Sequence, residues 1–354
     1  VEWLDAVVAI AADGSRAFAP ILGTGGNDGH LDFTNTFMEN SSRMLIAPGR
    51  KTPVKALIEH ALFGRDTVGL AKIKVGQYDP GRAGGFNQGQ GIETDSVANP
   101  WNFVLAMEGA VSWAAGIYRK QGIAYRSFLC SPFTVLPSAV GYGSATGNDE
   151  ATARAEIWTP LWNRPARWGE IRCLLREGCA SLGDRNAQNG LEFAQAVASL
   201  GVDRAIGGFV RYSLQRRRGD SCIALPAGVF SVRHRALSDL VRELNPLIEQ
   251  ADRAVRSRGK EVPNSWPPLL RQVEEAEYNL LLRDTPDLLV DLAAAVGCMH
   301  RWLLSREIET YLPRRLSEGW ISSCAPLPEV RIAAALASLR GTGRGIWYNL
   351  KRNA

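Results

Sequence analysis

From about residue 236 to residue 340, the sequence carries the apolar spacing of α-helices with few interruptions. Apolar side chains recur three and four positions apart, and short segments with proline or glycine separate one run from the next. The predicted helices cover residues 236–257, 268–283, 286–305, 307–318 and 328–340. A helix with one apolar stripe has to bury it against a neighbour. Residues 231–354 are therefore predicted to form an all-α helical bundle.

The first part of the chain, residues 1–230, mixes the patterns of strands and helices. Apolar runs at residues 6–12 and 17–22 flank the turn signal Asp13-Gly14, which is typical of a β-hairpin. Residues 212–216 and 221–225 flank a basic tip, Arg217-Arg218-Gly219-Asp220, and predict a second hairpin. Residues 127–164 are predicted to be irregular because proline and glycine recur there. The expected fold class is thus an α+β first part, with hairpins and a short sheet with packed helices and glycine-rich loops, followed by the all-α helical bundle.

Four helices are expected within this α+β part, at residues 31–45, 100–120, 165–181 and 191–200. The second has the strongest start signal, because Asn99 is a favourable N-cap and Pro100 suits a first turn. The buried face of the third is expected to consist of Trp168, Ile171, Leu174 and Leu175. Residues 76–99 are rich in Gly, Asn and Gln and are predicted to form one long loop.

Positive charge is concentrated in the middle of the chain. The net charge is +5, but residues 151–260 hold 18 Lys and Arg against 11 Asp and Glu. Residues 1–150 hold 12 against 14, and residues 261–354 hold 11 of each. A local basic region is the electrostatic feature expected of a surface that binds phosphate groups.

Cysteine usage and hydropathy favour a cytoplasmic location. The six cysteines are scattered and form no C-x-x-C pair, which is typical of reduced thiols in a cytoplasmic protein. The best apolar candidate for a membrane span, residues 104–118, is interrupted by Glu108 and is interpreted as a buried helix. No leader follows Val1, and the sequence is expected to be the interior of a longer chain. We expect no membrane partner.

The familiar catalytic motifs do not occur. None of the four histidines stands at metal-ligand spacing, and neither a P-loop nor a G-x-S-x-G elbow is present. The sequence therefore predicts a non-enzyme without cofactor or metal. One alternative stays open: a metal-dependent nuclease or a nucleotide-binding enzyme built on the first glycine-rich loop, with Asp28, Asp32 and Glu39 as convergent acids. In the other interpretation, Asp28 forms an Asx turn and Asp32 caps the following helix.

Five distinctive blocks occur in one order between residues 22 and 204. They are LGTGGNDGHLDFTN at 22–35, NPWNFVL at 99–105, PFTV at 132–135 with GYGS at 141–144, EIWTPLWNRP at 156–165 and GVDR at 201–204. Together they resemble the large subunit of subtype I-G (formerly I-U) CRISPR Cascade complexes. The helical remainder of the chain matches no motif of that family.

The resemblance implies a non-catalytic role in a ribonucleoprotein. Such a large subunit lies beside crRNA, the Cascade backbone subunits and the crRNA-processing subunit. It recognises a protospacer-adjacent motif (PAM) in the target double-stranded DNA, helps to open the duplex, and docks the helicase-nuclease that cuts it. RNA–DNA pairing then supplies sequence specificity, while the protein recognises the PAM, the shape and the backbone.

Two groups of residues are candidates for contact with nucleic acid. Glycine lets a backbone approach the narrow minor groove, where Asn and Gln can recognise polar groups. That group comprises Gly25, Gly26 and Asn27 on the first loop and Asn87, Gln88 and Gln90 on the second. The second group consists of arginines suited to phosphate: Arg164, Arg167, Arg172, Arg176, Arg216, Arg217 and Arg218.

Each group also has a structural interpretation. Asn27-Asp28-Gly29 could be a tight turn, and the helical arginines could pair with Glu170 and Glu177 as a solvated face. A scaffold whose basic surface contacts only protein is the remaining alternative.

Overall fold

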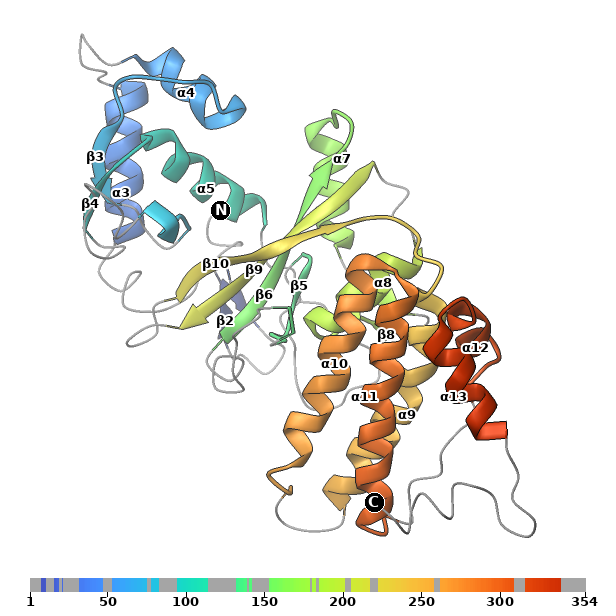
Figure 1. The fold of residues 1–354 in the computed structure, drawn as a ribbon. Helices are drawn as coiled ribbons and strands as arrows, with labels where there is room; N and C mark the ends of the chain where they lie inside the picture. The colour runs from blue at the N-terminus through green and yellow to red at the C-terminus, as the bar shows by residue number, and fades with distance from the viewer. Residues whose placement is uncertain are drawn as a thin grey trace. The chain divides into compact units, whose positions relative to one another are not determined.

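The computed structural model describes residues 8–10, 16–18, 21, 32–46, 53–74, 78–82, 94–113, 132–138, 140–141, 153–178, 180–182, 185–200, 205–216, 222–257, 262–308 and 316–338. Small antiparallel sheets packed with helices occupy the first part of the chain, and a run of helices follows (Figure 1). This arrangement confirms the predicted fold class. The chain forms two compact units, one of Val1–Phe193 with Arg204–Phe230 and the other of Ala194–Asp203 with Ser231–Ala354.

The predicted first hairpin and the helix after it are both present. β1 (Val8–Ile10) pairs antiparallel with β2 (Arg16–Phe18), with Ala9 opposite Ala17. α3 (Asp32–Ser41) continues into a π-helical turn, Ser42–Ile46. The predicted helix over residues 31–45 is therefore confirmed, although its last turn is wider than an α-helix.

A small α+β cluster follows in the chain. Its elements are α4 (Val54–Phe63), β3 (Ala71–Lys74), the 3-10 turn η3 (Pro80–Arg82), β4 (Asp95–Ala98) and α5 (Pro100–Ser112). β3 and β4 pair antiparallel, with Ala71 opposite Ala98. The prediction of a single loop over residues 76–99 is therefore wrong at η3 and β4.

Asn99 starts α5 as predicted and also ties it to α4. The Asn99 Oδ1 atom accepts a hydrogen bond from the Trp101 amide at 3.1 Å, and its Nδ2 donates to the Leu57 carbonyl at 2.6 Å. Leu57 and Trp101 are themselves buried in one apolar cluster with Met44 and Val104. α5 ends at Ser112, and residues 114–131, where the rest of the predicted helix falls, lie outside the described residues.

Three long strands and one short strand form a sheet whose order is β10-β9-β6-β5 (Figure 1). These strands are β5 (Thr134–Val135), β6 (Ala153–Trp162), β9 (Ile206–Arg216) and β10 (Cys222–Ser231). The prediction that residues 127–164 are irregular is wrong for β5 and β6. β9 and β10 are hydrogen-bonded neighbours joined by residues 217–221, as the hairpin prediction requires. Both strands are longer than predicted: β9 begins at Ile206 rather than at residue 212, and β10 ends at Ser231 rather than at residue 225.

Aromatic side chains form the core of this sheet. Trp158 of β6 is completely buried and stacks on Phe193 with a centroid distance of 4.6 Å. Phe209 and Phe230 meet the Trp158 ring edge-on at 6.4 and 5.8 Å. Phe133 lies 5.5 Å from Phe209 and closes the cluster. Aromatic pairs in these geometries add stability beyond the area they bury, so the cluster fixes β6 firmly against its neighbours.

Shorter elements connect β6 to β9. They are α7 (Trp168–Glu177), β7 (Ser181–Leu182), β8 (Arg185–Asn186) and α8 (Gly190–Leu200). Both helices were predicted, and α7 is shorter than expected at its two ends. Asn189 caps α8, because its Oδ1 accepts a hydrogen bond from the Glu192 amide at 2.9 Å.

The second unit is helical throughout its described part. Its further helices are α9 (Ser238–Ser257), α10 (Trp266–Arg283), α11 (Pro286–Ser305), α12 (Gly319–Cys324) and α13 (Pro328–Ser338). Four of these match predicted helices. The predicted helix over residues 307–318 is not helical at residues 307–308 and 316–318, and residues 309–315 lie outside the described residues.

A buried polar cluster joins three helices of the second unit. Gln195 of α8 and Asn245 of α9 exchange two amide hydrogen bonds, at 2.8 and 3.1 Å. The Gln195 Nε2 atom also donates to the carboxylate of Glu277 on α10, whose side chain is buried. A buried carboxylate is costly unless it is hydrogen-bonded, so the cluster selects one register of the three helices.

α11 meets the length and composition of a membrane-spanning helix, in contrast to the apolar run considered in the sequence. The core helix of a soluble protein meets the same two criteria, which makes this a weak indication. In the second unit, α11 packs along α10 and buries one face that contains Leu289, Leu292 and Met299.

Candidate nucleic-acid interface

The chain leaves the four-stranded sheet at Asn163, directly after β6. The Asn163 amide donates to the Ala205 carbonyl at 2.8 Å. The Asn163 side chain lies over Gly207, where an added Cβ would come within 1.9 Å of Oδ1. A larger residue at position 207 would displace the exposed Asn163 side chain. The residues that follow Asn163 therefore start from a fixed position at the end of the β6–β9 ladder.

Glu170 completes the first turn of α7. Its carboxylate accepts a hydrogen bond from the Arg167 backbone amide at 2.8 Å. The bond satisfies an amide at the helix start, and the negative charge suits the positive end of the helix dipole. On the other side of the helix, Leu174 and Leu175 are buried and anchor α7 to the first unit.

Four long side chains are exposed around this helix start. We call them the α7 face: Arg164, Arg167, Trp168 and Arg172. Trp168 is 55% exposed, so the prediction that it belongs to the buried face of α7 is wrong. Among the described side chains, no carboxylate forms an ion pair with any of the three guanidinium groups. The predicted pairing with Glu170 is absent there, and the Glu177 side chain is outside the described residues.

The α7 face has the two chemical groups that single-stranded nucleic acid requires. Trp168 and Arg172 are one helical turn apart, so the indole and the guanidinium are neighbours on the helix surface. An exposed indole can stack on any base, and guanidinium groups outside ion pairs can bind phosphates. Sequence reasoning found the three arginines and missed the tryptophan between them.

Arg216, the one arginine of the second hairpin within the described residues, lies at the opposite end of the sheet. β6 and β9 are antiparallel, with Trp162 opposite Ile206 at one end and Ala153 opposite Gln215 at the other. α7 follows the first end, whereas Arg216 ends β9 at the second. At a rise of about 3.3 Å per residue, the two ends are roughly 30 Å apart. The backbone of Arg216 is therefore far from the α7 face.

The remaining predicted contacts cannot be placed. For Arg176 and Arg216 only the backbone is described, and the other predicted residues lie outside the described residues. These are Gly25, Gly26, Asn27, Asn87, Gln88, Gln90, Arg217 and Arg218.

The acids of the alternative nuclease site are described only in part. Asp28 lies outside the described residues, and Asp32 is placed only as the first residue of α3. The carboxylate of Glu39 forms an ion pair with Arg43 at 3.1 Å and is 69% exposed. Within the described ranges, no group of three or more His, Cys, Asp or Glu residues could hold a metal ion.

A buried ion pair that the sequence did not reveal supports the sheet beside β6. Glu156 and Arg211 are 0% and 1% exposed. The Arg211 Nε and Nη2 atoms donate to the two carboxylate oxygens of Glu156 at 2.9 and 2.6 Å. The guanidinium also lies 5.6 Å from the centre of the Trp158 ring. A buried pair of this kind is stable only when its other hydrogen-bonding atoms are also satisfied.

Those other atoms hold the segment that leads into the GYGS motif at residues 141–144. Arg211 donates to the carbonyls of Ser138 and Val140 at 2.8 and 2.6 Å, and Glu156 accepts from the Ser138 amide at 2.7 Å. Gly141, the first residue of that motif, follows with φ of 79°. The start of α8 also approaches the pair, because a Cβ on Gly190 would lie 2.1 Å from Glu156 Oε2. The ion pair thus connects β6 and β9 to the segment around Ser138 and Val140 and to the start of α8.

Comparison with known proteins does not assign the chain to a family. No protein-family model matches it, and no curated protein sequence matches it either.

Proposed function

We propose that the chain is the non-catalytic large subunit of a type I-G CRISPR Cascade effector, which binds target DNA, contributes to PAM recognition and recruits the helicase-nuclease. The observation that carries the nucleic-acid-binding part is the α7 face, where three arginines without an ion-pair partner among the described residues surround an exposed tryptophan. The five sequence blocks between residues 22 and 204, which resemble those of this subunit, support the choice of assembly.

A guanidinium outside any ion pair can bind phosphate without losing another partner. An arginine already in a surface ion pair has to give up that partner before it binds phosphate, whereas the arginines of the α7 face have none among the described residues. Binding releases the counter-ions condensed on the nucleic acid, which makes the affinity depend on salt. A stacking side chain beside these cations favours strands whose bases are unpaired, such as the strand displaced when a duplex opens.

In this proposal the partners are crRNA, the target double-stranded DNA, the Cascade backbone and crRNA-processing subunits, and the helicase-nuclease, all in the cytoplasm. The protein would carry no catalytic residue of its own, because RNA–DNA pairing selects the target and the helicase-nuclease cuts it.

Purification of the tagged chain from cells that express the whole CRISPR locus tests the proposal. We expect it to bring down RNA of one uniform length together with a protein present in several copies. The same preparation should cut neither DNA nor RNA when Mg²⁺ or Mn²⁺ is added. Cleavage that is lost in the Asp28→Ala or Asp32→Ala variant would instead support the metal-dependent nuclease. Recovery of protein partners without RNA would support a scaffold that contacts only protein.

A further inference from the structure

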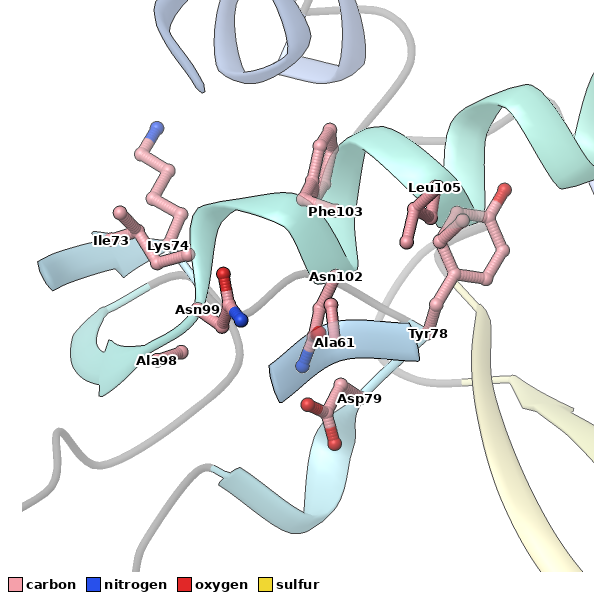
Figure 2. Close-up of a pocket in the computed structure, with 11 residues that line it drawn as sticks. Ala61, Ile73, Lys74, Tyr78, Asp79, Ala98, Asn99, Asn102, Phe103 and Leu105 are labelled. Atoms are coloured by element: carbon pink, nitrogen blue, oxygen red, sulfur yellow. The ribbon is translucent and has the colours of Figure 1, made fainter. Parts of the chain in front are cut away.

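A pocket of about 390 Å³ lies in the first unit, among α4, β3, β4, α5 and the two residues before η3 (Figure 2). Apolar side chains form much of its lining, among them Ala61, Ile73, Phe103 and Leu105. This volume is at the lower end of the range for pockets that bind small organic molecules, about 300–1,000 Å³. It suits a ligand of the size of one nucleoside rather than a larger cofactor.

Two polar side chains give the pocket its chemistry. The carboxylate of Asp79 and the amide of Asn102 point toward each other in Figure 2, and the Asn102 side chain acts on Asp79 as a donor that lowers its pKa. The Asp79 carboxylate also lies 3.6 Å from Arg82 Nε and is 42% exposed. The lining has three further polar residues, and each is directed elsewhere. The Asn99 amide caps α5 and bonds to Leu57, the Tyr78 hydroxyl donates to the Ile21 carbonyl, and the Lys74 side chain points away from Asp79 in Figure 2. Asp79 and Asn102 are therefore the groups that would meet a ligand.

The Asp79 carboxylate keeps acceptor capacity for a ligand. A carboxylate offers about four lone-pair positions, of which Asn102 takes at most one, because Arg82 at 3.6 Å contributes its charge rather than a hydrogen bond. Burial raises the pKa of Asp79 above its ordinary value, and the nearby Arg82 charge and the hydrogen bond from Asn102 oppose that rise. A partly desolvated carboxylate binds donors more strongly than one in bulk water.

The Asp79 carboxylate accepts hydrogen bonds, so it distinguishes the nucleobases by the donors that each presents. Guanine presents a ring N–H and an amino group side by side, and these two donors can meet one carboxylate as a pair. Adenine and cytosine place an acceptor nitrogen beside their amino group, which would face the negative charge. The second N–H of the Asn102 amide is suited to the guanine carbonyl oxygen. The apolar walls and the Tyr78 and Phe103 rings suit the faces of the base.

We propose that this pocket binds a guanine base, presented either by an unpaired nucleotide of a strand or by a free guanine nucleotide. The inference stands on the pocket alone and does not depend on membership of the assembly proposed above. The base lies between the apolar walls, its two donors on Asp79 and its carbonyl oxygen on Asn102. Arg82 keeps its contact with Asp79 and holds the carboxylate in place.

Equilibrium binding of nucleotides to the full chain tests this proposal. The probes are GMP, IMP, which lacks the amino group, and AMP, together with uridine oligonucleotides that carry one central guanosine or inosine. We expect GMP or the guanosine oligonucleotide to bind about tenfold more tightly than its inosine counterpart, since inosine makes one hydrogen bond fewer to the charged group. Binding of GMP identifies a free nucleotide as the source, and binding of the oligonucleotide alone identifies a strand.

Two variants that each remove one negative charge distinguish the loss of a pocket contact from a general effect of charge on binding. Asp79→Asn should weaken binding of the guanine probe by at least about tenfold and remove the preference for guanine over hypoxanthine. Asp66→Asn, an exposed position outside the pocket lining, should change neither. Thermal unfolding of both variants, expected to match the wild type, checks that the fold is retained. Equal binding of the three nucleotides, no binding of any probe, or an unchanged guanine preference in Asp79→Asn would overturn the proposal.

Discussion

Replacing Arg211 by Met is expected to lower the free energy of unfolding of the first unit by about 3–5 kcal/mol. The substitution leaves the Glu156 carboxylate buried without its counter-charge, and it removes the donors that hold the Ser138 and Val140 carbonyls. Hydrogen exchange at the backbone amides of β6 and β9 measures the effect, because each of these strands carries one member of the ion pair. Their protection should fall together.

An exposed ion pair provides the control for this prediction. Arg253 and Glu249 lie one turn apart on α9, 3.6 Å from each other, with side chains 76% and 55% exposed. Exposed pairs contribute about 0–1 kcal/mol, so Arg253→Met should leave the fold almost unchanged. Adding Glu156→Leu to Arg211→Met should restore part of the stability, because no unpaired charge then remains buried. Equal effects of Arg211→Met and Arg253→Met would show that the buried pair does not stabilise the sheet.

Replacing the three arginines of the α7 face by Gln is expected to weaken DNA binding by about 10- to 100-fold, alike for every sequence. Phosphate contacts carry no sequence information but supply most of the salt-dependent affinity. The slope of log K against log salt should become flatter by up to about 0.9 for each phosphate of duplex DNA that the variant no longer neutralises. Fluorescence anisotropy of labelled DNA between about 50 and 200 mM salt measures both quantities.

The matched control removes the same charge from arginines that already have partners. Arg242, Arg253 and Arg256 on α9 each form an ion pair with a carboxylate three or four residues away. Their replacement by Gln should change the salt slope much less. The variant with Gln at Arg216, Arg217 and Arg218 should have its own effect, which adds to that of the α7 face because Arg216 ends β9 far from that face. An unchanged salt slope in the α7-face variant or in the hairpin variant would mean that the replaced arginines bind no phosphate.

Helices were predictable from the sequence where local signals mark their starts. Pro100, Pro286 and the capping residue Asn99 stand where predicted helices begin. The sequence did not predict β6, because it lacks the pattern of a half-exposed strand and contains a proline. Most of its residues are buried on both faces, which removes the alternation of a half-exposed strand, and Pro160 argues against a central strand. Only pairing with β9, more than 40 residues later, makes this segment a strand.

The candidate sites depend on contacts that no local pattern encodes. Helical periodicity aligns Trp168 with Ile171 and Leu175, but only tertiary packing decides that the stripe is uncovered at Trp168. The separation of Arg216 from the α7 face follows from the length of the β6–β9 ladder, which the sequence pattern underestimated. Asp79 and Asn102 are 23 positions apart and meet only in the folded cluster around α5.

Target binding by the assembly, purified with and without this chain, tests the central claim most directly. Two DNA probes are compared: a duplex with the target sequence beside its PAM, and the single target strand alone. The account predicts that removal of the chain abolishes binding of the duplex and leaves binding of the single strand largely intact, because guide pairing to an open strand needs no PAM-dependent opening. Equal affinity for the duplex with and without the chain would contradict the account.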